Sequence, residues 1–443
     1  MELNSPLNWT VVKFGESCIF SQGIQVDVNL QSEVKKNNQV RFLRIIDFTQ
    51  GDDPPRYIDN PGEKYFLEKD EIAMVRYGTV GFVCTGKEGV IANNLFKIIP
   101  SEYLAKGYLI NFLKSQFFKS KLESKGATMQ ALNFGLINPI EIPLPPIAEQ
   151  MRIVAKIEEL FSELDKGIET LKTAQQQLKV YRQAVLKYAF EGRLTNPDVK
   201  EGELPEGWIA KTISELGKVK GGKRLPKGHD YSDSKTKYPY LRVTDFKNLS
   251  IDKKRLKYLK EDTHLAIKNY TISKDDVYIS IAGSIGFVGT IPIDLDGANL
   301  TENAAKITGL TEISNIYLAL YLSSGFAQEQ ISEHTIATTQ PKLSLFRIEK
   351  IKVTYPISKI DQSSIIQEIE SRLSVCYKIE ESIEQGLQQA EALRQSILKK
   401  AFEGRLVPQD PNDEPASVLL ERIKGERQKA QQEKKIKTKK VKA

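Results

Sequence analysis

Apolar residues recur at spacings of four and three positions through two long, otherwise polar stretches of this chain. The first stretch, 148–190, follows Pro145 and Pro146 and ends before Gly192, and the second ends before Gly404. A 3.5-residue period kept over several heptads is typical of a coiled coil, so we predict two long helices, the first about 60–65 Å in length. The first seam consists of Ile157, Phe161, Leu164, Ile168, Leu171, Gln175, Leu178, Arg182, Val185 and Ala189, and each position has a counterpart 212 residues later.

Arginine occupies one equivalent seam position in each stretch, Arg182 in the first and Arg394 in the second. A buried charge is costly unless it is paired, so these arginines would fix the register or orientation of the helices. The alternative is that their long stems carry the charge to the surface. We expect the two helices to pair with each other in antiparallel fashion, the alternative being that each packs on its own neighbouring domain.

The chain carries one unit of about 200 residues twice, as a tandem repeat. The offset between the copies drifts from about 198 to 212, so the connecting loops differ in length. The matched segments are LRIIDF (43–48) with LRVTDF (241–246), KDEIAMVRYGTVGFV (69–83) with KDDVYISIAGSIGFV (274–288), and YRQAVLKYAFEGRL (181–194) with LRQSILKKAFEGRL (393–406).

Short β-branched runs, broken by Gly, Pro and Asn, precede each predicted helix and indicate a mixed α/β domain. We therefore expect a mixed α/β plus all-α fold, in which two α/β domains are separated by two long helices that pair as an antiparallel coiled coil, with a pseudo-two-fold internal repeat. The predicted division is a first domain at 1–146, a first long helix at 147–195, a linker at 196–206, a second domain at 207–357, a second long helix at 358–406 and a basic C-terminal tail at 407–443.

The net charge of +7 is concentrated at one end of the chain. Segment 421–443 holds ten of the 64 basic and three of the 57 acidic residues, which leaves 54 of each in the remainder. Such a basic end is usually solvated. Any nucleic-acid interface in the body of the chain must therefore be argued from local clusters.

Cysteine and histidine are few and scattered. Cys18, Cys84 and Cys376 lie too far apart in the sequence to indicate a disulfide framework or a zinc site. No apolar run approaches the ~20 residues of a membrane span, and the N-terminus lacks the pattern of a secretion signal. We expect a cytoplasmic protein with no membrane association, no metal site and no catalytic residues.

One combination of motifs is distinctive. A domain that ends in IPLPPIAEQ (142–150), followed by a long helix that ends in AFEGRL (189–194), resembles the specificity (S) subunit of type I restriction–modification enzymes. The same order returns in the second copy, where AFEGRL stands at 401–406 but VTYPISKIDQ (353–362) keeps only one proline and the glutamine. The resemblance covers the chain except for the basic tail.

The resemblance implies a function. Each globular part would be a target recognition domain that reads one half of a bipartite, asymmetric sequence in double-stranded DNA. The helices would hold the domains apart and dock two methyltransferase subunits, which motor-nuclease subunits join for restriction. The chain itself would be non-catalytic, so S-adenosylmethionine, ATP and Mg are expected only in the partner subunits and no cofactor in this chain.

The repeated AFEGRL string has two compatible interpretations. Gly192 and Gly404 would cap the helices in a left-handed conformation. Because the helix ends match better than the domains do, they would also present one surface to two copies of one partner. The predicted partner-docking residues are Phe190, Arg193, Leu194, Phe402, Arg405 and Leu406.

Two other functions compete with this interpretation. A self-contained DNA methyltransferase would need a polar-Pro-Pro-aromatic string, and DPPR (53–56) has Arg56 in the aromatic position. No glycine-rich cofactor loop precedes it and no Walker A string occurs, so a loop is the better interpretation. A coiled-coil scaffold without a DNA role is the second alternative.

Local basic clusters argue against the scaffold, since lysines beside glycines suit contacts with phosphates, although a solvated loop is the plain alternative for each residue. Arg44 and Arg242, which lie beside Asp47 and Asp245, are expected to be structural. Gln130 and Gln340 are candidates for base readout. The remaining DNA-binding candidates are Lys218, Lys220, Lys223, Arg224, Lys227, Lys253, Lys254, Arg255 and Lys257 in the second domain, and Arg41, Arg56, Arg76, Tyr77, Lys121 and Lys125 in the first.

Overall fold

The computed structural model describes residues 6, 8–50, 53–124, 131–196, 198–200, 202–333, 335 and 341–425. The chain divides into two compact units, the first made of Met1–Thr170 with Gln385–Ala443 and the second of Leu171–Glu384. Each unit contains one α/β domain and parts of two long helices.

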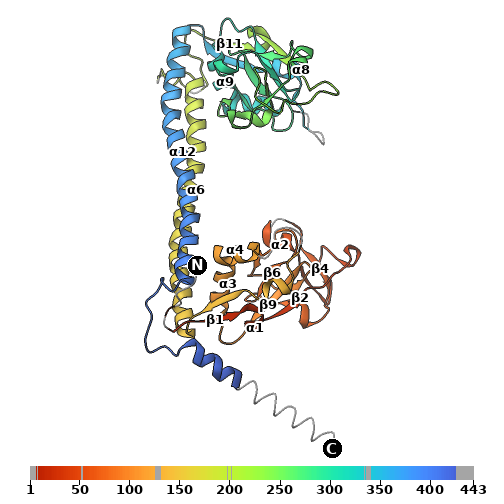
Figure 1. Ribbon diagram of the computed structural model, residues 1–443. Helices are drawn as coiled ribbons and strands as arrows, with labels where there is room; N and C mark the ends of the chain where they lie inside the picture. The colour runs from red at the N-terminus through yellow and green to blue at the C-terminus, as the bar shows by residue number, and fades with distance from the viewer. Residues whose placement is uncertain are drawn as a thin grey trace, which may run out of the picture. The chain divides into compact units, whose positions relative to one another are not determined.

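The domain of the first unit consists of two four-stranded sheets, a two-stranded ribbon and short helices, and Figure 1 shows its strands beside α3 and α4. Strand β6 is buried along its whole length because it lies inside the first sheet. The first sheet is antiparallel, in the order β2 (Cys18–Gln22), β9 (Leu95–Pro100), β6 (Ile72–Val75), β7 (Val83–Cys84). The second has the order β4 (Arg56–Asp59), β3 (Gln39–Leu43), β8 (Gly89–Ile91), β5 (Phe66–Leu67), and its β3–β8 pair is parallel. The other elements are β1 (Thr10–Lys13) paired with β10 (Glu141–Leu144), α1 (Phe14–Ser17), η1 (Val28–Leu30), α2 (Ile45–Thr49), η2 (Glu63–Tyr65), α3 (Lys106–Lys114), α4 (Gln116–Ser124) and α5 (Phe134–Ile137).

The domain of the second unit repeats this plan, with the same strand orders and a parallel pair at the same place, which confirms the internal repeat. Its antiparallel sheet has the order β12 (Lys218–Gly221), β21 (Ala304–Thr308), β18 (Val277–Ser280), β19 (Val288–Thr290). Its second sheet has the order β16 (Lys257–Tyr258), β13 (Pro239–Leu241), β20 (Ala298–Leu300), β17 (Thr271–Ile272), with β13–β20 parallel. The other elements are β11 (Trp208–Thr212) paired with β22 (Lys352–Pro356), β14 (Phe246–Lys247) paired with β15 (Ser250–Ile251), α7 (Ile213–Leu216), η3 (Val243–Asp245), η4 (Lys253–Arg255), α8 (Glu261–Ala266), η5 (Ile293–Leu295), α9 (Asn315–Leu322), α10 (Gly325–Glu333) and α11 (Leu345–Glu349).

The two long helices are α6 (Ile147–Phe190) and α12 (Lys359–Phe402), each of 44 residues. The first unit contains the beginning of α6 and the end of α12, and the second contains the end of α6 and the beginning of α12. Within each unit the segments contact each other, so the predicted antiparallel pairing is confirmed. The helices also join the domain cores, since α6 contributes Ile153 and Ile157, and α12 contributes Ala401, to the core of the first unit.

The seam arginines are partly buried and are paired with carboxylates across the helices, as the first of their two interpretations expects. Arg394 contacts the carboxylate of Asp165, and its guanidinium carbon lies 4.4 Å from the centre of the Phe161 ring. Arg182 donates to Glu380 at 2.7 Å and lies 4.5 Å from the centre of the Tyr377 ring. Each arginine thus meets one carboxylate and one aromatic ring of the other helix, which favours a single register.

A buried glutamine joins each domain to the start of its helix. Gln150 accepts a hydrogen bond from the Ala105 N–H and donates to the carbonyls of Tyr103 and Pro145. Gln362 accepts from the Ser314 N–H and donates to the carbonyls of Glu312 and Pro356. Both side chains are fully buried, and both make the same three kinds of contact, with donor–acceptor distances of 2.8–3.0 Å.

The helix ends confirm the predicted glycine caps. Gly192 and Gly404 have φ angles of 74° and 69°, in the left-handed region that favours glycine. A Cβ atom on Gly192 would lie 2.1 Å from Cγ of Pro205, and one on Gly404 would lie 2.2 Å from Cγ of Pro6. Both glycines therefore also allow close contact with the segment that leads into the domain of the same unit.

The aromatic residues before these glycines are core residues. The Phe402 ring packs 5.3 Å from Tyr108 and 5.4 Å from Phe112, and the Phe190 ring packs 5.0 Å from Tyr321. Only 2% of Phe402 and 3% of Phe190 is exposed. The prediction that these two side chains dock a partner is wrong, because each fills the junction between helix and domain.

Part of the predicted basic tail, 407–443, is folded, and this part includes the first residues of the stretch 421–443 that was expected to be solvated. Residues 416–425 are helical, and Ala416 and Ile423 are buried in the core of the first unit. Asp413 pairs with Arg152 of α6 at 2.6 Å. Residues 426–443, which hold eight of the ten basic residues of 421–443, lie outside the described residues.

Replacing Gly404 by alanine is expected to destabilise the first unit by about 1–3 kcal/mol, because a side chain in the left-handed region is strained and would collide with Pro6. Trp9, which adjoins Gly404, reports this unit by fluorescence during urea unfolding in a Trp208→Phe background. Gly167→Ala in the open middle of α6 is the matched control, expected to stabilise by up to about 1 kcal/mol. Equal effects of the two changes would contradict the role of Gly404.

Candidate nucleic-acid interface

In each domain an arginine follows the strand that forms the parallel pair. Arg44 follows β3 and Arg242 follows β13, and both are held by the carboxylate three residues later. Arg242 donates to Asp245 from its backbone N–H at 2.8 Å, from Nε at 3.1 Å and from Nη2 at 2.8 Å. Asp47 and Asp245 are only 3% and 2% exposed. The prediction that this pair is structural is confirmed, because the buried carboxylate fixes the turn that ends the strand.

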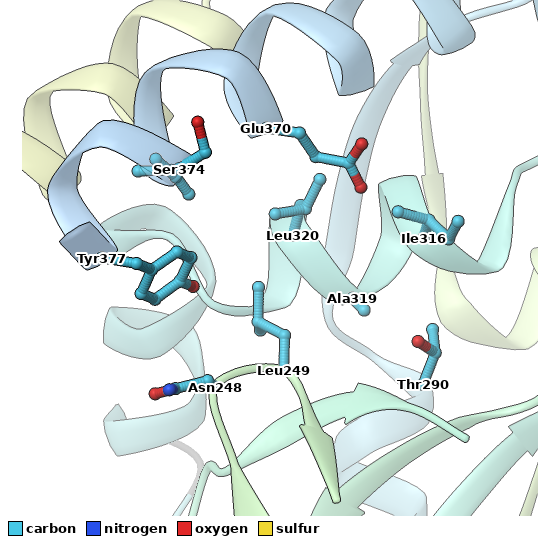
Figure 2. Close-up of a pocket in the computed structure, with 10 residues that line it drawn as sticks. Asn248, Leu249, Thr290, Ile316, Ala319, Leu320, Glu370, Ser374 and Tyr377 are labelled. Carbon is cyan, nitrogen blue, oxygen red and sulfur yellow. The ribbon is translucent and has the colours of Figure 1, made fainter. Parts of the chain in front are cut away.

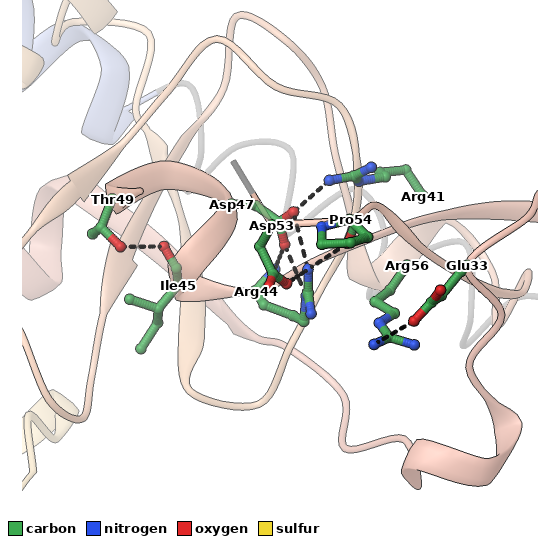
Figure 3. Close-up of polar contacts among 9 residues, drawn as sticks. All are labelled: Glu33, Arg41, Arg44, Ile45, Asp47, Thr49, Asp53, Pro54 and Arg56. Carbon is green, nitrogen blue, oxygen red and sulfur yellow. Dashed lines mark hydrogen bonds and ion pairs between the residues drawn. The ribbon is translucent and has the colours of Figure 1, made fainter. Parts of the chain in front are cut away.

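Around Arg44, the first domain gathers two further arginines (Figure 3). Arg41 also contacts Asp47, and its guanidinium carbon lies 5.9 Å from the centre of the Tyr57 ring. Arg56, at the start of β4, pairs with Glu33 at 2.9 Å. These two predicted DNA-binding residues are brought together here, on neighbouring strands and both partly exposed.

The DPPR string has a structural task in this cluster. Arg44 Nη2 lies 2.7 Å from Asp53 Oδ2 and donates to the Pro54 carbonyl at 3.0 Å. Burial opposes the charge of Arg44, but its hydrogen bonds to Asp47 and Asp53 outweigh this and raise its pKa above the ordinary value. The polar group and the carbonyl that a methyltransferase motif would offer to an amino group are thus occupied, which supports the loop interpretation.

The second domain presents most of the predicted lysines at its surface. Lys218 and Lys220 are exposed on β12, an edge strand, and Lys227 is exposed in the loop that follows. Lys257 on β16 occupies the place of Arg56 on β4, because Tyr240 pairs with Lys257 as Phe42 pairs with Arg56. Exposed ammonium groups on an edge strand and its loop can follow a phosphate backbone.

Other candidates in this domain already have contacts. Lys253 bonds both carboxylate oxygens of Asp294 at 2.7 Å, and this lysine lowers the pKa of Asp294. Arg224 donates from Nε to Glu302 at 2.7 Å. The ammonium group of Lys223 lies 5.5 Å from the centre of the Tyr270 ring, and that of Lys257 lies 5.8 Å from the centre of the Tyr231 ring. The last two candidates, Lys254 and Arg255, are exposed.

The remaining candidates of the first domain are more scattered. Arg76 donates from Nε to the Leu132 carbonyl at 3.2 Å and lies 5.3 Å from the centre of the Tyr77 ring, which is 44% exposed. Lys121 Nζ lies 5.5 Å from the centre of the Phe117 ring on α4. Lys125, Gln130 and Gln340 lie outside the described residues.

The polar residues of the two helix ends also differ in exposure. Arg193 lies over Tyr188 at 4.5 Å and pairs with Glu191 at 3.3 Å, whereas Arg405 contacts Glu403 and is 65% exposed. Leu194 and Leu406 pack on the cores of their units. Arg193 and Arg405 remain candidates for partner docking.

A pocket of about 310 Å³ in the second unit offers little chemistry (Figure 2). It lies between the β14–β15 hairpin tip, Asn248–Leu249, and helices α9 and α12. Among the described residues that line it, Glu370 is the one carboxylate and none is a histidine or lysine. Burial raises the pKa of the thiols of Cys18 and Cys84 to about 12, so they are protonated and poor nucleophiles.

The described residues contain no group of three or more His, Cys, Asp and Glu side chains placed to hold a metal ion. Within the same ranges, each helix is too short or too polar to cross a bilayer.

Comparison with known proteins shows the family. The sequence profile of the type I restriction modification DNA specificity domain matches residues 6–179 and 205–389. The chain is 26% identical over 414 residues to the type I restriction enzyme EcoBI specificity subunit of Escherichia coli, which covers 88% of this chain and 87% of that protein. It is 28% identical over 356 residues to the StySPI specificity subunit of Salmonella potsdam, which covers 74% and 73%. The chain therefore belongs to the family of type I restriction–modification DNA specificity proteins.

A solved structure shares the fold. It is described as "Structural basis underlying complex assembly and conformational transition of the type I R-M system", and one of its chains aligns with a TM-score of 0.70 at 18% identity. The alignment covers 91% of this chain and all of the other. The resemblance inferred from IPLPPIAEQ and AFEGRL is thus confirmed at the level of family and fold.

Sequence reasoning missed one surface feature. Gln25 with Asn93, and Arg224 with Glu302, form polar pairs at equivalent places in the two domains, and of these four residues only Arg224 was a predicted DNA-binding residue. The available signal was a glycine at 23 and at 222, an offset of 199 that is one residue more than the 198 of the LRIIDF match downstream.

Replacing Asp47 by alanine is expected to destabilise the first domain by about 2–4 kcal/mol, because Arg41 and Arg44 would then have no buried partner. Glu33→Ala removes the 59% exposed partner of Arg56 and is the matched control, expected to change stability by about 0.5 kcal/mol or less. Urea unfolding followed through Trp9 measures both. A mild effect of Asp47→Ala would show that the turn does not depend on this carboxylate.

Proposed function

We propose that this chain is the non-catalytic DNA-recognition subunit of a type I restriction–modification enzyme, in which each α/β domain reads one half of a bipartite, asymmetric site. The observation that carries the proposal is that the two domains share their internal structure but differ in their exposed side chains. Both domains share strand order, the arginine–aspartate turn and the buried glutamine, yet their exposed groups differ at matching places. Two readers of different half-sites need this combination.

The arginine and lysine clusters supply the affinity in this proposal. Lysines on β12 and its loop would contact phosphates and position the second domain, without reading sequence. Arg56 and Lys257, at equivalent strand positions, would do the same in the two domains. A domain that presents several such groups gains binding energy that falls as salt rises.

The catalytic partners follow from the named relatives and from the repeated helix ends. We propose that two methyltransferase subunits dock along the paired helices near Arg193 and Arg405, and that motor-nuclease subunits join for restriction. S-adenosylmethionine would then bind in the methyltransferase, and ATP and Mg in the motor. In this proposal the chain contributes DNA recognition and partner docking, and the chemistry belongs to the partner subunits.

The test is to express the chain with a methyltransferase subunit of its own system in cells that lack other modification, and to sequence the methylated DNA. The proposal predicts one asymmetric motif made of two short halves at a fixed gap. Methyl transfer by the isolated chain, or a continuous motif, would contradict it.

Replacing Lys218, Lys220 and Lys227 together by glutamine is expected to weaken DNA binding to every sequence. The slope of log affinity against log salt should become shallower by up to about three, one for each phosphate that a lysine no longer neutralises. Competition binding of the assembled methyltransferase at several salt concentrations measures this. Glutamine at Lys253, which is already paired with Asp294, is the control and should change the slope less. An unchanged slope in the triple variant would remove β12 from the interface.

A further inference from the structure

The backbone follows the same path past one glycine in each of the two domains. The N–H of Gly23 donates to the Leu95 carbonyl, and the N–H of Gly222 donates to the Ala304 carbonyl. A Cβ atom on Gly23 would lie 2.2 Å from the Ala92 carbonyl oxygen. One on Gly222 would lie 2.1 Å from the Thr301 carbonyl oxygen. Only glycine allows this approach, so the chain leaves the first sheet along the same path in both copies.

The residues that follow this crossing differ in chemistry. Gln25 accepts a hydrogen bond from the Asn93 amide at 3.1 Å, and at the matching place Arg224 donates to Glu302 at 2.7 Å. Gln25 is exposed, and 78% of the Arg224 side chain is exposed. The Arg44–Asp47 and Arg242–Asp245 pairs are instead identical in both copies and centred on a buried carboxylate. The variable pair is therefore a surface feature that the fold itself does not require.

We propose that these two pairs read bases: Arg224, oriented by Glu302, reads a guanine in the half-site of the second domain, and Gln25 with Asn93 reads an adenine in the half-site of the first. The inference rests on the proposed function and names the groups that carry its sequence specificity. Arginine is suited to O6 and N7 of guanine, and a side-chain amide to N6 and N7 of adenine, because each matches both atoms of one base edge.

The contact between Arg224 and Glu302 leaves the base-reading end of the arginine side chain available. It uses Nε, and no hydrogen bond of the terminal amino groups is found in the described part of the chain, so both can face a base edge. Glu302 is itself held, since it accepts from the Thr301 hydroxyl at 3.0 Å and lies 3.5 Å from the hydroxyl of the buried Tyr240. Glu302 is thus a positioning residue that fixes the plane of the guanidinium.

The lysines beside Arg224 can position the domain on DNA, whereas Arg224 reads a base. Lys223 precedes Arg224 and lies over Tyr270, and Lys227 follows in the same loop. These lysines can contact phosphates on either side of the base that Arg224 reads. The first domain has Ile24 in place of Lys223, so there the amide pair carries the polar contacts of this turn.

The amide pair of the first domain offers donors and acceptors side by side. Asn93 uses one amide hydrogen on Gln25 Oε1, which leaves the Gln25 amide group and the Asn93 carbonyl oxygen for a base. A donor and an acceptor together match N7 and N6 of adenine, whereas guanine presents two acceptors.

The test transplants the first-domain pair into the second domain as Arg224→Gln with Glu302→Asn, in the complete chain assembled with its methyltransferase. Sequencing of methylated DNA should show one base pair of one half-site change from guanine to adenine, with the other half-site and the gap unchanged. Competition binding should show a loss of about 5- to 150-fold for the original duplex over the duplex with the new base.

Single variants separate readout from structure. Glu302→Ala should relax the preference for guanine at that one position, and Glu302→Gln, which keeps an acceptor for Nε, should retain most of it. Lys227→Gln is the matched control and should weaken binding to all sequences equally, without changing the motif.

The outcomes separate the inference from the proposed function. If the wild-type complex methylates a bipartite motif and the transplant leaves that motif unchanged, the base-reading role of Arg224 is wrong while the proposed function stands. If the wild-type complex shows no bipartite motif, the proposed function fails and the inference with it. Where the transplanted chain folds but methylates nothing, Glu302→Ala decides: a relaxed guanine preference supports the inference, and an unaltered one overturns it.

Discussion

The attachment of each domain to its helix depends on one buried glutamine. Gln150 and Gln362 have no access to water, so each amide must find its partners inside the protein. Each side chain joins three backbone groups of the domain and of the turn that starts the helix. Removal of one partner would leave a buried polar group unsatisfied, at a cost of about 1–3 kcal/mol. The position of a domain on its helix is therefore closely fixed, and it is fixed in the same way twice.

This attachment explains why the two copies can differ so much elsewhere. The helix pairing is held by Arg182 and Arg394, and the helix ends by Gly192 and Gly404, none of which lies at the candidate DNA interface. The surface groups around Gly23 and Gly222 can then change without disturbing the core. A recognition protein gains new specificity most readily when the side chains that read are separate from those that fold.

Much of this architecture could be predicted from the sequence because it is periodic or repeated. The 3.5-residue seam predicted the helices, the offset of 212 predicted matching registers, and the caps followed from glycine chemistry. The burial of Phe190 and Phe402 could not be predicted, because a repeated aromatic residue suits a core and a docking surface equally well. The Arg224–Glu302 and Gln25–Asn93 pairs were missed since their members lie 78 and 68 residues apart and meet only when β20 and β8 are placed. The helix at 416–425 was not predicted, because the strongly basic residues that follow it indicated a solvated tail.

In the proposed function, equivalent attachments present two different readers to one DNA duplex. The most direct measurement is the methylation motif of a chain in which segments 8–146 and 207–357 have been exchanged, assembled with its methyltransferase. Because each domain meets its helix through the same glutamine contacts, the account predicts that the exchanged chain recognises the same double-stranded sequence with the same gap, bound in the opposite orientation. A different motif from a folded, exchanged chain would contradict it.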